Sequence, residues 1–325
     1  MSRTAFPSLR DPARASRGRG ARGTGAPAAV ALVVAAVLAA LAATPAHAIT
    51  GGVPDGDAHP NVGALGWDLD GTGPIPPVLI CGGSVISDRA FLTARHCIEP
   101  PLVPLPSDVQ WAVTLEGGTP AAPILPGGFF PEEYPACCAF TDESALVRPI
   151  QIVLHPDFTP GFVPGVSDPT LGAHDLAVLL FAPGTFAGVD PVRIVRRGRL
   201  GRLRAAGDRH GPGFTFVGYG TELREDRFYA AGYRKAARLA FDALLPDWLL
   251  TRSAAGRSPR SGTPCYGDSG SPLFLGGSSV QAALFHTTAG PCTGAAYHQR
   301  LDTPAEQAFL APYLPRRHGA YRGHR

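Results

Sequence analysis

The chain alternates short hydrophobic runs with segments rich in Gly, Pro and Asp. Runs of this length, bounded by turn residues, predict β-strands rather than helices. The predicted strands are Val62–Leu69, Val78–Ser87, Ala90–His96, Val109–Glu116, Ile150–His155, Leu176–Ala182, Phe214–Tyr219, Ser271–Leu275, Val280–Thr287 and Ala295–Leu301. Many short strands with few helices favour an all-β barrel or sandwich.

Few segments depart from this pattern. Near the end, the run Asp302-Thr303-Pro304-Ala305-Glu306 supplies a cap residue, a Pro near the first helical position and an acid in the first turn, which predict a C-terminal helix. Residues 316–325 form a basic, apolar-poor tail that we expect to be disordered. The Arg-rich stretch 193–204 lacks interleaved aromatic residues and is interpreted as a solvated loop.

The N-terminal segment is hydrophobic without interruption from Ala28 to Ala43. Six Arg precede it and Ala46-His47-Ala48 follows, a layout that predicts a cleavable secretory signal over residues 1–48. An uncleaved anchor is the alternative, although the run is shorter than the ~20 residues that span a bilayer. Cleavage leaves 277 residues and changes the formal net charge from +3 to −2, so composition gives no case for nucleic-acid binding and leaves no membrane segment.

All six Cys follow this segment, and an even number predicts disulfides in an oxidising, extracellular compartment. Abundant Arg, Ala, Pro and Gly suggest a bacterial source. Adjacent Cys137 and Cys138 could form a vicinal disulfide, stay reduced or pair between chains, and the role of the surrounding 117–149 insertion is left open. With no CxxC or HExxH spacing, no metal or other cofactor is predicted.

The segment CYGDSGSP, Cys265–Pro272, carries the most specific chemistry. A Ser among small residues ahead of an apolar strand indicates an exposed nucleophile whose neighbouring N–H groups can approach a substrate carbonyl. LTARHC places His96 after an apolar strand, and AHDLAVLLF places Asp175 at the head of another. The order His96, Asp175, Ser269 supplies a base, an orienting carboxylate and a nucleophile.

With these motifs in this order, the chain resembles the chymotrypsin/trypsin-like serine peptidase family. The resemblance covers residues 49 to about 315 and rests on ITGG, TARHC, HDLAVL and GDSGSP. It implies an all-β fold of two antiparallel six-stranded barrels, about 49–187 and 188–315, with a C-terminal helix. It also implies two bridges, Cys81–Cys97 and Cys265–Cys292.

The resemblance further implies roles for named residues. His96, Asp175 and Ser269 would form the catalytic triad, and the N–H groups of Gly267 and Ser269 the oxyanion hole. The amine of Ile49, exposed by signal removal alone, would pair with Asp268 and order that hole. Thr263, Thr288 and Ala295 would line a primary pocket without charge, which predicts cleavage after small or medium uncharged residues. The protein is expected to be a monomer. Its expected partners are protein or peptide substrates and, as a candidate, a protein inhibitor.

Besides Thr50, which replaces the usual Val, two departures from the family pattern bear on activity. Arg95 replaces a small residue, and a long cation there must reach solvent or an acid. Either His286 or Thr287 stands where the family has the Ser that supports the catalytic Asp. These departures keep a second hypothesis open, a weak or inactive peptidase homologue that acts as a secreted binding protein. A third, an esterase on an α/β-hydrolase fold, needs Gly-x-Ser-x-Gly and a Ser-first order, whereas position 271 is Ser and the order is reversed.

Overall fold

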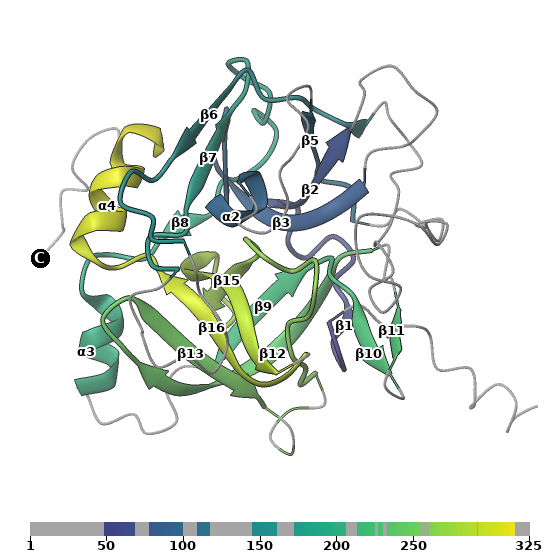
Figure 1. Ribbon diagram of the computed structural model, residues 1–325, viewed down its shortest axis with the longest axis vertical. Helices are drawn as coiled ribbons and strands as arrows, with labels where there is room; N and C mark the ends of the chain where they lie inside the picture. The colour runs from purple at the N-terminus through teal and green to yellow at the C-terminus, as the bar shows by residue number, and fades with distance from the viewer. Residues whose placement is uncertain are drawn as a thin grey trace, which may run out of the picture. The chain divides into compact units, whose positions relative to one another are not determined.

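The computed structural model describes residues 49–68, 78–99, 109–117, 145–160, 172–205, 213–224, 227–229, 233–254, 256, 258, 260–290 and 292–315 (Figure 1). All of them belong to one compact unit that runs from Ala46 to Arg325. The expected signal segment, the Cys137-Cys138 pair, the tail and most of the 117–149 insertion lie outside these residues. Within them, no helix has the length and hydrophobicity needed to cross a membrane.

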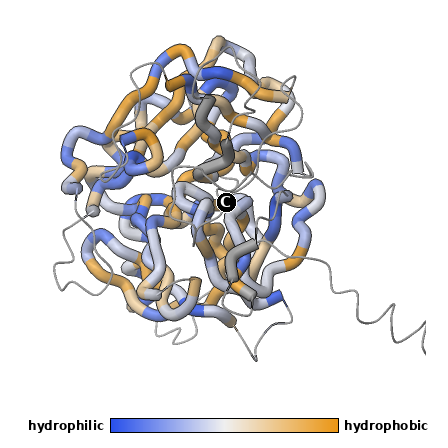
Figure 2. The backbone as a smooth tube through the Cα atoms, turned by 45° about the vertical axis from the view of Figure 1, so that its right-hand side comes forward, coloured by the Kyte–Doolittle hydropathy of each residue, from blue (hydrophilic) through white to orange (hydrophobic). Residues whose placement is uncertain are grey.

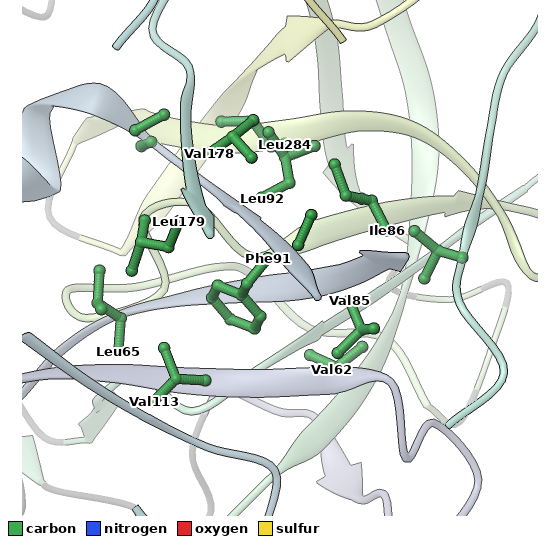
Figure 3. Packing of buried hydrophobic residues seen from close by; sticks show 14 of the residues in the cluster. Val62, Leu65, Val85, Ile86, Phe91, Leu92, Val113, Val178, Leu179 and Leu284 are labelled. Atoms are coloured by element: carbon green, nitrogen blue, oxygen red, sulfur yellow. The ribbon is translucent and has the colours of Figure 1, made fainter. Parts of the chain in front are cut away.

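The first sheet has six antiparallel strands in the order β5-β2-β3-β4-β7-β6. Its strands are β2 (Val62–Asp68), β3 (Val78–Ser87), β4 (Ala90–Thr93), β5 (Gln110–Thr114), β6 (Gln151–Leu154) and β7 (Ala177–Leu180). Figure 3 shows its core, where Phe91 packs among side chains from several strands and Leu284 enters from the second sheet. The two sheets therefore share one hydrophobic cluster.

The six antiparallel strands predicted for the first barrel are confirmed, and their sheet curls into a half-barrel that does not close. Among the described residues, β5 meets the segment that precedes β6 at one isolated bridge, in which Val113 and Val147 exchange both backbone hydrogen bonds at 2.9 Å. The next donor on that ladder would be Pro149, two residues further on, which has no N–H. The ladder therefore cannot continue in that direction.

The second sheet does close. Strands β9 (Phe214–Gly218), β12 (Lys235–Leu244), β13 (Trp248–Ser253), β16 (Thr293–Arg300), β15 (Val280–Gly290) and β14 (Pro272–Leu275) form a ring that returns to β9. Two short strands extend it: β1 (Val53–Pro54) pairs with β12, and β8 (Arg193–Ile194) runs parallel to β15. A separate hairpin joins β10 (Glu222–Arg224) and β11 (Arg227–Tyr229). The second barrel is thus six-stranded, as predicted.

The described residues also include four short helical segments: α2 (Arg95–Ile98), α3 (Arg199–Ala205), α4 (Pro304–Leu310) and the 3-10 turn η2 (Ala311–Tyr313). The predicted C-terminal helix is confirmed in α4, where Thr303 Oγ1 accepts from Glu306 N at 3.5 Å. The interpretation of the Arg-rich stretch as a loop is wrong in part, because its last residues form α3. Leu200 is buried there and its N–H donates to Asp302 Oδ2 at 2.8 Å, which fixes the helix against the body.

The pattern analysis missed β12 and β13. Along β12 the residues Lys235, Ala237 and Leu239 are buried and alternate with half-buried ones, a period of two that marks a strand. A charged Lys at a buried position and Ala on both faces give no hydrophobic alternation, and both residue types have low strand propensity, so the sequence did not predict this strand. Figure 2 shows hydrophobic segments along the backbone, interrupted by hydrophilic ones.

Candidate active site

His96 and Asp175 meet because their strands are neighbours. His96 lies in α2 immediately after β4, Asp175 lies two residues before β7, and β4 pairs with β7 through Thr93 and Ala177. The carboxylate receives the backbone N–H of His96 on Oδ1 at 2.8 Å, and Oδ2 lies 2.6 Å from His96 Nδ1. His96 was expected at the end of a strand and instead sits in a helical turn, which brings its N–H and its ring to the same carboxylate.

His286 is a third group on this carboxylate. Its Nδ1 lies 2.5 Å from Asp175 Oδ2, and its ring meets the His96 ring edge-on with centroids 5.0 Å apart. Residue 286 is the extra residue of a β-bulge: Phe285 pairs with His298 and Thr287 with Tyr297, so β15 advances two residues while β16 advances one. A bulge re-aims a side chain. The open choice between His286 and Thr287 is therefore decided in favour of His286.

Burial and neighbouring charges shift the pKa values of Asp175 and His286. Burial by itself would raise the pKa of Asp175, but His96 and His286 hold it well below its usual range. Burial lowers the pKa of His286, so its ring is neutral at neutral pH. A carboxylate oxygen only accepts, so each histidine presents a protonated Nδ1 to Asp175. In the neutral form of His96, Nε2 then carries the lone pair and can act as a base.

Arg95 does not intrude on this arrangement. Its guanidinium donates to Glu99 Oε2 at 2.7 Å and to the main-chain oxygen of His155 at 2.5 Å, and it lies 5.1 Å from the centre of the Phe158 ring. The acid partner that a cation at this position requires is thus Glu99, four residues along the same turn.

Ser269 lies in a tight turn that leads into β14. Gly267 and Gly270 have φ of +85° and +81°, and a Cβ on Gly270 would overlap Thr93 Oγ1 and the main-chain oxygen of Gly82. Only glycine fits that position. The Ser269 carbonyl accepts from Gly82 N at 2.8 Å, which ties the turn to β3 beside the Cys81–Cys97 bridge.

The turn leaves two N–H groups available. Those of Asp268, Gly270 and Ser271 donate to main-chain oxygens of Cys265, Phe285 and Asp268 at 2.8–3.1 Å. Within the described part of the chain, no acceptor is found for the N–H groups of Gly267 and Ser269. The Ser269 hydroxyl donates to the main-chain oxygen of His286 at 3.4 Å. Both N–H groups could therefore receive a ligand oxygen beside the hydroxyl.

The expected pocket residues occupy two places. Thr263 is buried and pairs with Thr50, its N–H donating to the Thr50 carbonyl at 2.9 Å. Thr288 is half-buried on β15 opposite Ala296, next to the half-buried Ala295 on β16. Their joint action as one pocket stays a prediction.

Both disulfides implied by the resemblance are confirmed. Cys81 is bonded to Cys97, and Cys265 to Cys292. The first holds α2, and with it His96, to β3. The second holds the start of the Ser269 turn to the hairpin between β15 and β16. Each bridge therefore stands next to one part of the candidate site.

Sequence reasoning gave His155 and His174 no role, yet the structure groups them with Glu306. His174 Nδ1 lies 2.6 Å from Glu306 Oε1, and the backbone N–H of His174 donates to Gln299 Oε1 at 2.9 Å. Helix α4 and strand β16 therefore together fix the residue before Asp175. The only sequence signal was the adjacency of His174 to Asp175.

Three side-chain groups among the described residues offer ligand atoms for a metal ion, and one of them, Cys81, His96 and Cys97, contains a disulfide. The other two are His155, His174 and Glu306, and His96, Asp175 and His286. In the first of these two groups the imidazoles stack with planes only 14° apart, so one ion cannot lie in both ring planes. In the second, both Nδ1 atoms donate to Asp175, so a metal would have to displace those protons. Neither group is arranged as an open ligand set.

Comparisons with known proteins give a fold. No protein-family model matches the chain, and no curated protein matches it. Among solved structures, human heparin binding protein is 15% identical at a TM-score of 0.51, and the match covers 84% of this chain and 100% of that one. A structure of HL collagenase is 15% identical at a TM-score of 0.53, with 82% and 100% covered. The chain therefore has the chymotrypsin-like serine protease fold.

Proposed function

We propose that the chain is a secreted serine endopeptidase. The observation that carries this proposal is the fully buried Asp175 carboxylate, which holds His96 by its backbone N–H and by its ring. Such a contact keeps an imidazole in one tautomer with Nε2 free to take a proton.

In the proposed reaction, Ser269 Oγ attacks the carbonyl carbon of a peptide bond and its proton passes to His96 Nε2. The oxygen that becomes negative is received by the N–H groups of Gly267 and Ser269. The C–N bond then breaks as His96 returns the proton to the leaving amine. A water molecule hydrolyses the resulting acyl-enzyme by the same proton route. Ser269 Oγ must first turn from the His286 carbonyl toward His96.

Specificity and location belong to the same proposal. Thr263, Thr288 and Ala295 give the primary pocket no charge, which favours small or medium uncharged side chains such as Ala, Val, Thr or Leu. The two disulfides fit an oxidising, extracellular setting. Signal cleavage after Ala48 would release the mature chain at Ile49.

A second candidate function is a secreted binding protein with little or no peptidase activity. One observation favours it: the Ser269 hydroxyl is engaged with a main-chain oxygen rather than with His96. The similar structures also include a protein named for binding heparin. The intact Ser269, His96 and Asp175 favour the peptidase.

Labelling of the secreted protein with a fluorophosphonate separates the two functions. The peptidase should be labelled at Ser269 and should hydrolyse a peptide library, while Ser269→Ala should remain folded and lose both properties by several orders of magnitude. Hydrolysis retained by purified Ser269→Ala contradicts the triad assignment. A folded wild type that is neither labelled nor active favours the binding protein.

A further inference from the structure

Lys235 is the only lysine of the chain, and it is fully buried. An ammonium group taken out of water without partners loses several kcal/mol, so buried lysines persist only beside acceptors or opposite charge. One partner is the main-chain oxygen of Ile49, which accepts from Lys235 Nζ at 3.2 Å. A neutral acceptor alone does not balance the charge.

The sheet places the opposite charge on the same face. Lys235 pairs directly with Gly218 across β12 and β9, and directly paired residues project their side chains to the same side of a sheet. Gly218 has no side chain, and a Cβ there would overlap Asp268 Oδ1. The Asp268 carboxylate therefore fills the space of the missing side chain, beside that of Lys235.

Asp268 is itself fully buried, one residue before Ser269. Its Oδ1 accepts from Gly220 N at 2.8 Å and its Oδ2 from Cys265 N at 2.9 Å, so the carboxylate fastens the start of the turn to the loop after β9. Burial raises the pKa of Asp268 to about 7, against the effect of these N–H groups and of the Lys235 charge. Removal of the nearby cation would destabilise the ionised carboxylate further.

We infer that Lys235 is a positioning residue, an internal cation that holds the Asp268 carboxylate and the Ser269 turn in place while Ile49 is still joined to Ala48. The inference rests on the proposed function, since it concerns regulation of that site. It departs from what the resemblance implies, in which a freed Ile49 amine supplies this charge.

The N-terminal segment supports this reading. Ile49 is fully buried in the second hydrophobic cluster although its nitrogen is part of a peptide bond. Its carbonyl accepts from Gly52 N at 2.8 Å as well as from Lys235. Ile49 is thus already seated in this cluster, with its carbonyl held by Lys235, before its amine is released. The turn does not depend on the exact end of the mature chain.

The test compares two N-termini in four backgrounds. The protein is prepared starting at Ile49 or at Ala48, as wild type, Lys235→Met, Lys235→Arg and Arg238→Met. Arg238 is the matched control, because it is a cation three residues further along β12 whose side chain is only half-buried. The rate of fluorophosphonate labelling and kcat/KM for one peptide substrate are measured for each protein.

The wild type starting at Ala48 should be labelled within about threefold of the form starting at Ile49, because Lys235 supplies the charge. Lys235→Met starting at Ala48 should lose about a hundredfold, whereas the same variant starting at Ile49 keeps its own ammonium and loses less. Lys235→Arg should recover most of the rate, and Arg238→Met should behave as wild type. The inference is overturned if wild type starting at Ala48 is inactive while wild type starting at Ile49 is active, or if Lys235→Met starting at Ala48 is as active as wild type starting at Ala48.

Hydrogen exchange of the turn 265–271 keeps the inference testable without activity. In a Ser269→Ala background starting at Ala48, Lys235→Met should lower the protection of these amides, with the first sheet unchanged. Equal protection with and without Lys235 overturns the inference even when the protein is a peptidase. Reduced protection in a protein that is never labelled supports it and rejects only the proposed function. If Lys235→Met does not fold, Lys235→Arg, which should keep protection, is compared with Lys235→Gln.

Discussion

Replacing His286 tests the reasoning about the buried carboxylate. His286→Phe keeps a ring of similar size against Trp248, whose ring centre lies 5.1 Å away, but removes the Nδ1–H that donates to Asp175 at 2.5 Å. His286→Asn is the matched control, since its amide nitrogen can occupy the place of Nδ1 and keep the donor. The pair of variants separates hydrogen bonding from packing.

The magnitude follows from the type of bond. A hydrogen bond to a charged group contributes about 1.5–3 kcal/mol, and Asp175 keeps its two bonds from His96. His286→Phe should therefore lower the free energy of unfolding by about 1.5–3 kcal/mol. If the same loss applies to the transition state, kcat/KM falls by about 10- to 100-fold, at tenfold for each 1.4 kcal/mol.

Urea unfolding measures the first quantity, and hydrolysis of one peptide substrate measures the second. The unfolding midpoint should move to lower urea with an unchanged m-value, which shows that stability rather than compactness has changed. His286→Asn should retain most of both quantities. The reasoning is refuted if His286→Phe unfolds and hydrolyses like wild type, or if His286→Asn is as impaired as His286→Phe.

Three further predictions concern other parts of the chain. Burial lowers the pKa of His298 to about 3, so the unfolding free energy should fall as the pH drops from about 6.5 towards 3, because the unfolded chain binds a proton that the folded chain excludes. His298→Gln should flatten this slope by about 1.4 kcal/mol per pH unit in urea titrations, and an unchanged slope would contradict the assignment. N-terminal sequencing of the secreted protein should give Ile-Thr-Gly-Gly, and mature protein that begins elsewhere would reject cleavage after Ala48. Peptide-library profiling should show cleavage after small or medium uncharged residues in graded order, since one methylene changes discrimination by only ~1–3 kcal/mol, and a dominant preference for Arg or Lys would show that Thr263 is not at the base of the pocket.

The chemistry of the site was readable from local sequence. A nucleophile turn requires small residues in a fixed order, so GDSGSP, together with His96 and Asp175, makes Ser269 the predicted nucleophile. The Cys beside His96 and the Cys ahead of Ser269 each had a partner implied by resemblance, and both bridges are present. Strands with hydrophobic runs, such as Ala177–Leu180, were found because their pattern is set by burial on the sheet.

Other features depend on contacts between segments far apart in the chain, and no local pattern encodes them. The bulge that aims His286 at Asp175 is visible only in the register of β15 against β16, and the open first sheet only in the single bridge between Val113 and Val147. Lys235 looks like an ordinary polar residue in the sequence. The tertiary structure buries it because Gly218, opposite it, leaves room for the Asp268 carboxylate. The sequence by itself determined which residues can do the chemistry, whereas long-range strand pairing decided which of them meet, since burial and register belong to pairs of segments and not to either one alone.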